Sequence, residues 1–460
     1  MVKKKVTLFG AGNFGRVHAN DLANLQVLGG IVDTDPSKKE IADKYSVPFF
    51  NTDLTKYVID LGYGRVVKSL SEARELEKVK YEEMIWGTSF DAPNEDYYTR
   101  EYSIVKEIYK KFENGELQDI PEDLNEVLNK TDAIDIATNT PSHFPLMLFG
   151  LKEKKDIFVE KPPTESVDEL SYILHFYPKA KIGVDYIEMA HPVVQATKDD
   201  MDFKPNYSFN KRSKDLREVV QRGIGGGEGS RIILEDLVHD LSEVDLFRKN
   251  AYGKSFAKVY PEVVDAEIQC WYELPERKNG KPKYPYSTDV RAKFTLKFPD
   301  GMISEIEGGF ADPEIRQYVL VDGEGKIAEY GNTLTRPNIS PIAARVEGKK
   351  NVEYLLEKVK SGVITDQEKQ DEVLKRANAE TLEEDMNKYV PEAKWVDGKP
   401  MYGWAPLYNM LDNFLEAKSS KELICPLEQA LEYQRIAEEV YHKAGKPDAM
   451  VYKVLGGDGK

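Results

Sequence analysis

The sequence VTLFGAGNFG occupies residues 6–15 and begins with four residues that predict a short β-strand. Its glycines follow the pattern G-x-G-x-x-G, in which each glycine has its own steric task. Gly10 permits a tight turn, Gly12 lets a pyrophosphate approach the backbone, and Gly15 lets the next helix pack closely on the strand. A helix predicted from Arg16 then presents free N–H groups to the phosphates. The stretch therefore predicts an N-terminal Rossmann domain that binds a dinucleotide.

The next strand is predicted over residues 27–32 and is followed by an acid, Asp33. Asp33 lies close to the distance of about 20 residues at which this fold places the carboxylate that binds the cofactor ribose. A carboxylate binds the free 2′-OH of NAD and repels the 2′-phosphate of NADP. We therefore predict NAD as the cofactor. Lys38 and Lys39 follow a little further on, so NADP remains the less favoured alternative.

The sequence DIFVEKPP at residues 156–163 places a lysine at the end of another predicted strand. Pro162 and Pro163 end this strand because neither can donate to the hydrogen-bond ladder. Ligands of open α/β sheets bind beyond the carboxyl ends of the strands. Lys161 is therefore predicted at the binding edge, beside Glu160. The alternative is an ion pair that only closes the strand.

A strand predicted over residues 133–137 leads into the turn TNTPSH at 138–143. On the layout of a Rossmann domain this turn lies beside the nicotinamide. His143 can contact the cofactor there, or it can merely cap the following helix. The predicted cofactor contacts are Gly10, Gly12, Asn13, Phe14, Gly15, Asp33, Thr138, Asn139, Thr140, Pro141, His143, Glu160 and Lys161.

The composition is that of a globular protein with more than one domain. The chain has 460 residues, of which 41% are hydrophobic and 31% charged, and this length predicts two or three domains. A net charge of −16 and a pI of about 5.1 argue against nucleic acid or an anionic membrane as partner. Cys270 and Cys425 lack metal-site spacing and predict buried thiols in the reducing cytoplasm, with no metal site.

Two domains are expected. Residues 1–185 form the Rossmann domain, with a polar insertion at about 51–126. Residues 186–460 form an α+β domain for substrate binding and oligomerisation, with a helical insertion at about 346–400. Its sheet is predicted to be large, mostly antiparallel and open on one face, with strands at 263–272, 290–298, 302–310 and 318–321 and with hairpin turns at Asp300-Gly301 and Asp322-Gly323. An open sheet face needs a cover, so a homodimer or homotetramer is expected.

The order of these features resembles the Gfo/Idh/MocA oxidoreductases, a family that includes glucose–fructose oxidoreductase-like and inositol dehydrogenase-like proteins. The resemblance rests on the glycine pattern, Asp33, the turn at 138–143 and the Glu-Lys-Pro at 160–162, and it covers most of the chain outside the two insertions. It implies that Lys161 lies beside the nicotinamide and the reacting hydroxyl. There an ammonium can stabilise a developing alkoxide or pass a proton.

The sequence GGGEGSRIILEDLVHDL at residues 225–241 predicts a glycine loop followed by a helix. Glu235 and His239 are four residues apart and share one face of that helix. A carboxylate at this spacing can orient an imidazole and raise its basicity, or the two can form an ordinary solvated pair. The resemblance implies an Asp-x-x-x-His that faces the substrate, with the His as general acid/base; Glu235 stands here at the Asp position. Asp240 and Asp245 are expected on the helix surface.

Two other segments bear on the substrate. Family members often carry an Asn-Arg pair just after the last Rossmann strand, where this chain has the different sequence IEMAHP at 187–192. Tyr186, Glu188 and His191 are candidate contacts in this crossing. Lys211, Arg212 and Arg217 could meet an acidic substrate, although an exposed basic stretch is the favoured interpretation.

These observations predict an NAD(P)-dependent dehydrogenase that acts on a hydroxyl-bearing carbon of a sugar, inositol or related polyol. The alternatives are a glycosidase or lyase that uses NAD transiently, and a non-catalytic sugar or cofactor sensor, because a fold does not determine a function. The predicted catalytic residues are Lys161, His239 and Glu235, and the predicted substrate contacts are Lys161, Tyr186, Glu235 and His239.

Overall fold

The computed structural model describes residues 4–52, 122–164, 167–213, 233–253, 255–256, 258–271, 288–309, 317–331 and 405–444, together with residues 360, 367, 395–396 and 399–400. Most of the insertions predicted at 51–126 and 346–400 lie outside these residues. The chain divides into two compact units, and 411–431 join the first of them. The first unit is 1–185 with 411–431, and the second is 186–410 with 432–460.

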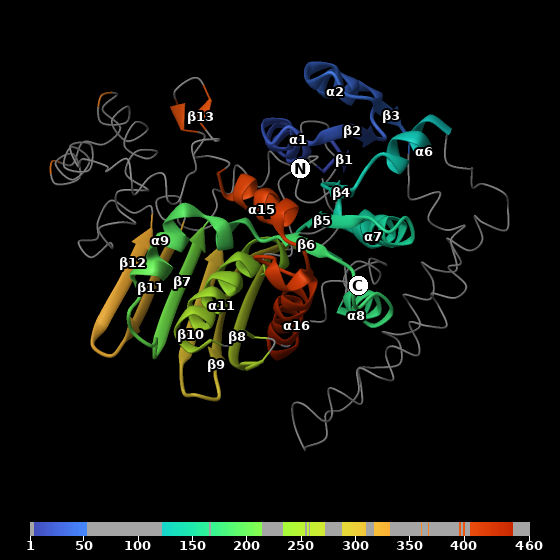
Figure 1. Ribbon diagram of the computed structural model, residues 1–460. Helices are drawn as coiled ribbons and strands as arrows, with labels where there is room; N and C mark the ends of the chain where they lie inside the picture. The colour runs from blue at the N-terminus through green and yellow to red at the C-terminus, as the bar shows by residue number, and fades with distance from the viewer. Residues whose placement is uncertain are drawn as a thin grey trace. The chain divides into compact units, whose positions relative to one another are not determined.

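The first unit contains a six-stranded parallel sheet with the order β3-β2-β1-β4-β5-β6 (Figure 1). This is the strand order of a doubly wound Rossmann sheet, as the sequence predicts. Its strands are β1 (Val6–Phe9), β2 (Leu28–Asp33), β3 (Phe49–Asn51), β4 (Ala133–Ile136), β5 (Asp156–Glu160) and β6 (Ile182–Asp185). Its helices are α1 (Gly15–Asn24), α2 (Lys39–Tyr45), α6 (Glu122–Asn129), α7 (His143–Lys152) and α8 (Val167–Phe176).

The parallel strands are buried on both faces, which explains their near-continuous apolar sequences. All four residues of β1 and of β4 are buried, including the polar Thr7 and Asp135. Phe158 of β5 packs against Phe414 of the 411–431 segment, with the ring centroids 5.4 Å apart. Cys425 is a buried free thiol in this unit, as predicted.

The second unit contains a six-stranded mixed sheet with the order β12-β11-β7-β10-β9-β8. All neighbours are antiparallel except β7 and β10, which run parallel. The strands are β7 (Tyr207–Ser213), β8 (Glu262–Trp271), β9 (Thr288–Lys297), β10 (Ile303–Gly309), β11 (Gln317–Gly323) and β12 (Lys326–Gly331). A two-stranded piece pairs β13 (Trp395–Val396) with β14 (Lys399–Pro400).

The helices of this unit include α9 (Pro192–Asp200) and α11 (Val238–Tyr252), and α11 lies across one face of the sheet (Figure 1). The remaining helices, α15 (Ala405–Glu416) and α16 (Leu427–Lys443), contribute residues to both units. Gly308 on β10 permits the close packing of the helical layer, because a Cβ there would lie 2.2 Å from the Leu237 side chain. None of the helices in the described residues has the length and apolarity needed to cross a membrane.

Two details of this sheet differ from the sequence-based expectation. The hairpin turn predicted at Asp322-Gly323 lies two residues later, at Glu324-Gly325, where both φ angles are positive as in a type I′ turn. Strand β7 was not predicted, although it lies in the middle of the sheet. Its inward-facing residues include Ser208 and Asn210, which are polar and yet fully buried, so the apolar alternation that marks a half-buried strand is missing.

Candidate functional site

The glycine loop joins β1 to α1 with the geometry that its sequence predicts. Gly10 has φ +88°, a conformation that L-residues with a side chain rarely adopt. A Cβ on Gly15 would lie 2.2 Å from the Gly10 carbonyl oxygen, so this position needs a glycine for close packing. A Cβ on Gly12 would meet no atom of the described residues within 4 Å, which leaves its backbone open to a ligand. Asn13 and Phe14 beside it are exposed.

Asp33 is tied to this loop from the end of β2. Its Oδ2 accepts a hydrogen bond from the Ala11 backbone N–H at 2.6 Å, and its Oδ1 accepts one from the Asp35 N–H at 2.7 Å. The carboxylate is thus held against the glycine turn while it remains partly exposed. This is the place where a ribose hydroxyl would meet it in a Rossmann domain.

The turn after β4 and the segment after β5 meet through His143. Its Nδ1 lies 2.9 Å from the Pro162 carbonyl oxygen, and its Nε2 lies 3.1 Å from the Thr138 carbonyl oxygen. The His143 side chain is 1% exposed, so the buried ring connects the turn after β4 to the segment after β5. The first three residues of the turn are more exposed than His143: Thr138, Asn139 and Thr140. The Pro141 side chain lies outside the described part of the structure.

Lys161 follows directly after β5, at the carboxyl edge where the glycine loop and Asp33 also lie. Its backbone N–H donates to Glu160 Oε2 at 3.1 Å. The Lys161–Pro162 peptide bond is cis. Glu160 itself is 8% exposed, so its carboxylate turns into the domain, away from the open edge.

Glu160 belongs to a buried cluster that the sequence did not reveal. His18 of α1 lies at its centre: His18 Nδ1 is 2.8 Å from Asp135 Oδ2, and His18 Nε2 is 2.9 Å from Glu160 Oε1. Asp185 Oδ2, at the end of β6, lies 3.7 Å from the same Nε2. A polar residue inside the apolar strand at 133–137 was the signal that could have pointed to this cluster.

The charged groups in this cluster shift one another's pKa values. Burial by itself lowers the pKa of His18, but the carboxylates of Asp135 and Glu160 outweigh it and hold the pKa of His18 well above its usual value. Burial raises the pKa of Asp185 well above its usual value, and the neighbouring Glu160 adds to the rise. For Glu160, burial opposes ionisation, yet contact with His18 leaves its pKa below the usual value.

In the second unit, His239 lies in the first turn of α11 and is 6% exposed. The Tyr186 ring stands edge-on to it, with the ring centroids 6.2 Å apart. Residues Ile233–Leu237 just before α11 form a π-helical turn, a rare feature that often occurs at functional sites. Because that turn is wider than an α-helical turn, the four-residue spacing from Glu235 to His239 does not by itself place them on one face. The Glu235 side chain lies outside the described part of the structure.

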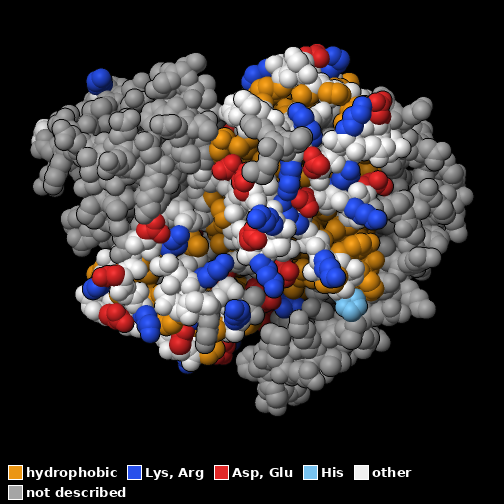
Figure 2. Space-filling model, in the orientation of Figure 1, with side chains coloured by type: hydrophobic (Ala, Val, Ile, Leu, Met, Phe, Trp, Pro, Cys, Tyr) orange, Lys and Arg blue, Asp and Glu red, His pale blue; other side chains and the backbone are white. Residues whose placement is uncertain are grey.

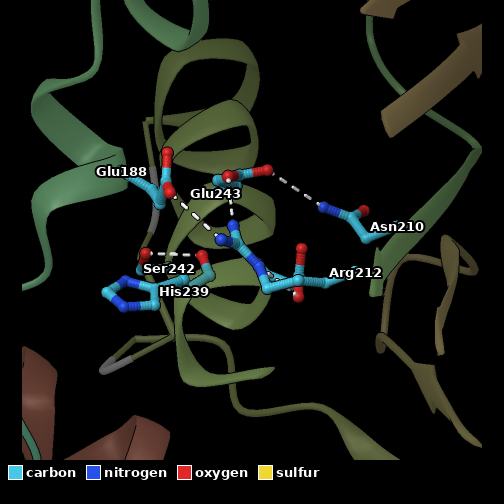
Figure 3. A network of polar contacts seen from close by, with 7 residues as sticks. Glu188, Asn210, Arg212, His239, Ser242 and Glu243 are labelled. Atoms are coloured by element: carbon cyan, nitrogen blue, oxygen red, sulfur yellow. Dashed lines mark hydrogen bonds and ion pairs between the residues drawn. The ribbon is translucent and has the colours of Figure 1, made fainter. Parts of the chain in front are cut away.

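A buried ion network surrounds Arg212 near His239 (Figure 3). The guanidinium contacts three carboxylates, from Glu188 at 3.0 Å, Asp240 at 3.2 Å and Glu243 at 3.3 Å. Asn210 donates to the other oxygen of Glu243 at 3.2 Å, and the Ser242 hydroxyl donates to the His239 carbonyl oxygen at 2.7 Å. Burial raises the pKa of Asp240 to about 6, against the opposing charge of Arg212.

This network corrects three sequence-based expectations. Arg212 is not part of an exposed basic stretch, because only 13% of its side chain is exposed and it extends from the central strand β7. Asp240 and Asp245 are not on the helix surface, because both are fully buried. Asp245 accepts hydrogen bonds from the Phe256 N–H at 2.6 Å and the Tyr433 hydroxyl at 2.9 Å. Helix α11 is buried on nearly all sides, so the charged residues in its sequence wrongly predicted an exposed face.

The predicted site residues thus form two groups. The glycine loop, Asp33, the turn at 138–143 and Lys161 share one edge of the parallel sheet in the first unit. Tyr186, Glu188, Arg212 and His239 belong to the second unit. On the face shown in Figure 2, acidic and basic side chains of the described residues are interspersed.

Residues 100–184 match a family model described as "Oxidoreductase family, NAD-binding Rossmann fold", GFO_IDH_MocA. No curated protein sequence matches significantly.

Solved structures resemble the fold of the whole chain at low sequence identity. The UDP-N-acetylglucosamine 3-dehydrogenase from Acidithiobacillus ferrooxidans is 13% identical, with a TM-score of 0.53 over 96% of this chain and 98% of that chain. The scyllo-inositol dehydrogenase from Lactobacillus casei, solved with bound NAD(H) and scyllo-inositol, is 10% identical, with a TM-score of 0.53 over 96% of each chain. The myo-inositol 2-dehydrogenase from Lactobacillus plantarum is 15% identical, with a TM-score of 0.50 over 96% of this chain and 98% of that chain.

The resemblance to the Gfo/Idh/MocA oxidoreductases that the sequence predicts is therefore confirmed, by the match of residues 100–184 to the family's NAD-binding Rossmann fold and by dehydrogenases that share the fold of the chain.

Proposed function

We propose that this protein is an NAD-dependent dehydrogenase that transfers a hydride between C4 of the nicotinamide and a hydroxyl-bearing carbon of a sugar, an inositol or a related polyol. The observation that carries the proposal is the edge of the parallel sheet in the first unit. There the open backbone of Gly12, the anchored carboxylate of Asp33 and Lys161 lie at the carboxyl ends of β1, β2 and β5 in one Rossmann sheet. The match to an NAD-binding oxidoreductase family model supports the same conclusion.

In this proposal the cofactor is held by the residues predicted from the sequence. Gly10, Gly12 and Gly15 cradle the pyrophosphate at the N-terminus of α1, and Asp33 binds the adenosine ribose. The turn at 138–143 lies along the nicotinamide. Bound NAD supplies the hydride acceptor, and every other task falls to side chains of this chain.

The chemical roles of Lys161 and His239 follow from their types. During oxidation the His239 imidazole takes the hydroxyl proton as general base, and the Lys161 ammonium holds the same oxygen and stabilises its developing charge. Glu235 orients the imidazole, and Tyr186 bounds the substrate beside the His239 ring. Arg212 does not recognise an acidic substrate, because Glu188, Asp240 and Glu243 already occupy its guanidinium.

A screen of sugars, polyols and inositols for NADH formation tests the activity, followed by Lys161→Ala and His239→Ala on the best substrate. A positioned acid or base contributes about 10²–10⁴ in rate, so each variant is expected to lose kcat by about that factor. Affinity for NAD should change little, because neither residue belongs to the phosphate loop. Variants that turn over as fast as the parent would contradict the assigned roles. Alcohol release from glycosides without net NADH would instead indicate the NAD-using glycosidase or lyase.

The cofactor preference has its own test at Asp33. Asp33→Ser removes the carboxylate that repels a 2′-phosphate, and the variant should therefore gain affinity for NADP relative to NAD. Fluorescence titration of both cofactors measures the change. Tighter binding of NADP than of NAD by the unmodified protein would refute the preference.

We also propose that the protein assembles as a homodimer or homotetramer through the outer face of the mixed sheet. Phe209 of β7 is paired with Leu320 of β11 on that face, and both are partly exposed. Ion pairs flank them, from Arg291 to Glu307 at 2.8 Å and from Lys293 to Glu305 at 3.9 Å. Light scattering at micromolar concentration should give a particle of more than one chain, and a particle of 52.4 kDa would refute this assembly.

A further inference from the structure

The cluster around His18 includes Glu160, the residue that precedes Lys161 in the chain. Its members come from four elements of the first unit: His18 from α1, Asp135 from β4, Glu160 from β5 and Asp185 from β6. His18 and Asp135 are fully buried, Asp185 is 1% exposed and Glu160 is 8% exposed. Water therefore has almost no access to these groups, and each charge depends on its neighbours in the cluster for stabilisation.

The contacts of His18 determine its protonation state. Each ring nitrogen lies within 2.9 Å of a carboxylate oxygen, Nδ1 of Asp135 and Nε2 of Glu160. An ionised carboxylate only accepts hydrogen bonds, whereas a neutral imidazole has one N–H to donate. When both carboxyl groups are ionised, both contacts are satisfied at once only by an imidazolium, which donates from both nitrogens. The rings of Phe14 and Phe158 lie beside the imidazole and add no further charge.

Asp185 would add a third negative charge to the cluster if it were ionised. Its carboxyl oxygens are buried, and one of them lies 3.7 Å from His18 Nε2. Burial and the neighbouring Glu160 carboxylate raise the pKa of Asp185 well above its usual value, which favours the protonated carboxyl group. His18 Nε2, Glu160 Oε1 and Asp185 Oδ2 lie within 4.8 Å of one another, a spacing that suits a metal ion as well. A metal would need the Nε2 lone pair, which the imidazolium does not have.

Glu160 connects this cluster to Lys161 through its two oxygens. Oε1 faces the His18 imidazolium, and Oε2 accepts the Lys161 backbone N–H at 3.1 Å. The imidazole thus joins the helix that follows the glycine loop to the strand end that carries Lys161. Removing the charge on His18 would release Oε1 and allow the Glu160 side chain, and with it the Lys161 backbone, to shift.

We propose that His18 is a positioning residue: in its protonated form it fixes Glu160 and thereby holds Lys161 in its place at the carboxyl edge of the parallel sheet. The proposal rests on the proposed function for its kinetic consequence, since Lys161 acts there on the reacting oxygen. It predicts that kcat falls at alkaline pH when His18 loses its proton. The charged groups that face His18 are Asp135, Glu160 and Asp185, and Lys161 faces Glu160.

The protonation state can be tested without any substrate. The chain has six histidines, and ¹⁵N NMR of the ring nitrogens distinguishes an imidazolium from either neutral tautomer. The resonance that is lost in His18→Gln should remain that of an imidazolium at pH 8, above the usual pKa of histidine. Asp135→Asn keeps the hydrogen-bond acceptor and removes the charge, so it should lower the His18 titration by about one to three pH units. A neutral His18 at pH 8, or an unchanged titration in Asp135→Asn, would overturn the proposal.

The link to Lys161 has a second readout that is also independent of turnover. Reductive ¹³C-methylation labels the lysines, and Lys161→Arg identifies the Lys161 resonance. His18→Gln should shift that resonance and its titration, whereas the exposed His175→Gln should leave both unchanged. A Lys161 resonance that is the same in His18→Gln and in the parent would refute the positioning role.

The kinetic test uses the best substrate of the screen. His18→Gln should lower kcat by on the order of 10²-fold, the loss expected from a small displacement of a catalytic group, with little change in the KM for NAD. Asp135→Asn should move the alkaline limb of kcat to lower pH by the same amount as the NMR titration of His18. An alkaline limb that stays in place while the titration moves would contradict the proposal. So would a metal ion bound at one per chain in the isolated protein and lost in His18→Gln.

These outcomes separate the two hypotheses. A protein that shows the NMR behaviour but forms no NADH with any substrate contradicts the proposed dehydrogenase and not the role of His18. A protein that oxidises a polyol while its His18 is neutral supports the dehydrogenase and contradicts the role of His18.

Discussion

Each unit contains, among its described residues, a buried cluster of one basic side chain and three carboxyl groups. In each of them a single cation faces three carboxyl groups. In the first unit the cation is His18, with Asp135, Glu160 and Asp185; in the second it is Arg212, with Glu188, Asp240 and Glu243. Both clusters lie close to a predicted catalytic residue, the first next to Lys161 in the chain and the second next to His239.

The difference lies in the chemistry of the cation. A guanidinium does not lose its proton in proteins, so any response of the Arg212 cluster to pH must come from its carboxyl groups. Burial accordingly raises the pKa of Asp240 to about 6. An imidazolium can lose its proton, so the cation itself titrates in the first cluster. The stability that the two clusters contribute is therefore expected to change in different pH ranges, around and below pH 6 for the Arg212 cluster and above pH 6.5 for the His18 cluster.

The largest effect is expected from removal of the permanent cation. Arg212→Met removes the cation that faces three buried carboxyl groups, and removal of one member of a buried ion pair typically costs about 3–5 kcal/mol of unfolding free energy. Urea unfolding at pH 7 measures the loss. Arg291→Met is the matched control, because Arg291 forms a half-exposed ion pair with Glu307 and such pairs contribute about 0–1 kcal/mol. Equal losses in the two variants would show that the burial of the Arg212 cluster has no energetic weight.

The second effect is a change in pH dependence at Asp240. The folded-state pKa of Asp240 is raised from 3.8 to about 6, so its contribution to stability is present below about pH 4 and is lost as the pH rises through 6. A difference of about two units corresponds to about 3 kcal/mol. In Asp240→Asn the decline of the unfolding free energy between pH 4 and pH 7 should therefore be smaller by about that amount. An unchanged slope in urea titrations across this range would show that Asp240 is ionised throughout it.

The third and smallest effect is the contribution of His18 to stability, which is lost at alkaline pH. The folded-state pKa of His18 is raised well above its unfolded value of 6.5, so its contribution is complete below pH 6.5 and is lost as the pH rises through the folded pKa. His18→Gln should cost about 1.5–3 kcal/mol at pH 6, typical of hydrogen bonds to charged groups. The cost should shrink at high pH. A cost that is the same at pH 6 and pH 10 would remove the distinction between the two clusters.

Much of the first unit could be predicted because its signals are local. The glycine at position 10 needs a positive φ, the one at 15 needs the absence of a side chain, and prolines end β5. Each of these requirements is visible in a few consecutive residues. The strand order of the Rossmann sheet then follows from a small set of allowed topologies.

The second unit was harder to predict because its polar residues are buried. Strand β7 presents Ser208, Asn210 and Arg212 towards the helical layer, where an apolar alternation was expected. The Ser208 hydroxyl finds Ser304 on the neighbouring strand at 2.8 Å, and Arg212 finds its carboxylates on α11 and in the segment before α9. These partners are distant in the chain, so no pattern of neighbouring residues predicts the contacts.

The sequence by itself determined the Rossmann fold, the resemblance to an oxidoreductase family and the position of Lys161 at a strand end, because these depend on backbone conformation within short segments. Only the tertiary structure decided which charges are buried and what they face. Asp135, Glu160, Asp185 and His18 are spread over more than 160 residues of sequence and meet within a few ångströms. The pKa of a side chain depends on its burial and on the charges around it, and both are properties of packing across the fold that a linear pattern does not contain.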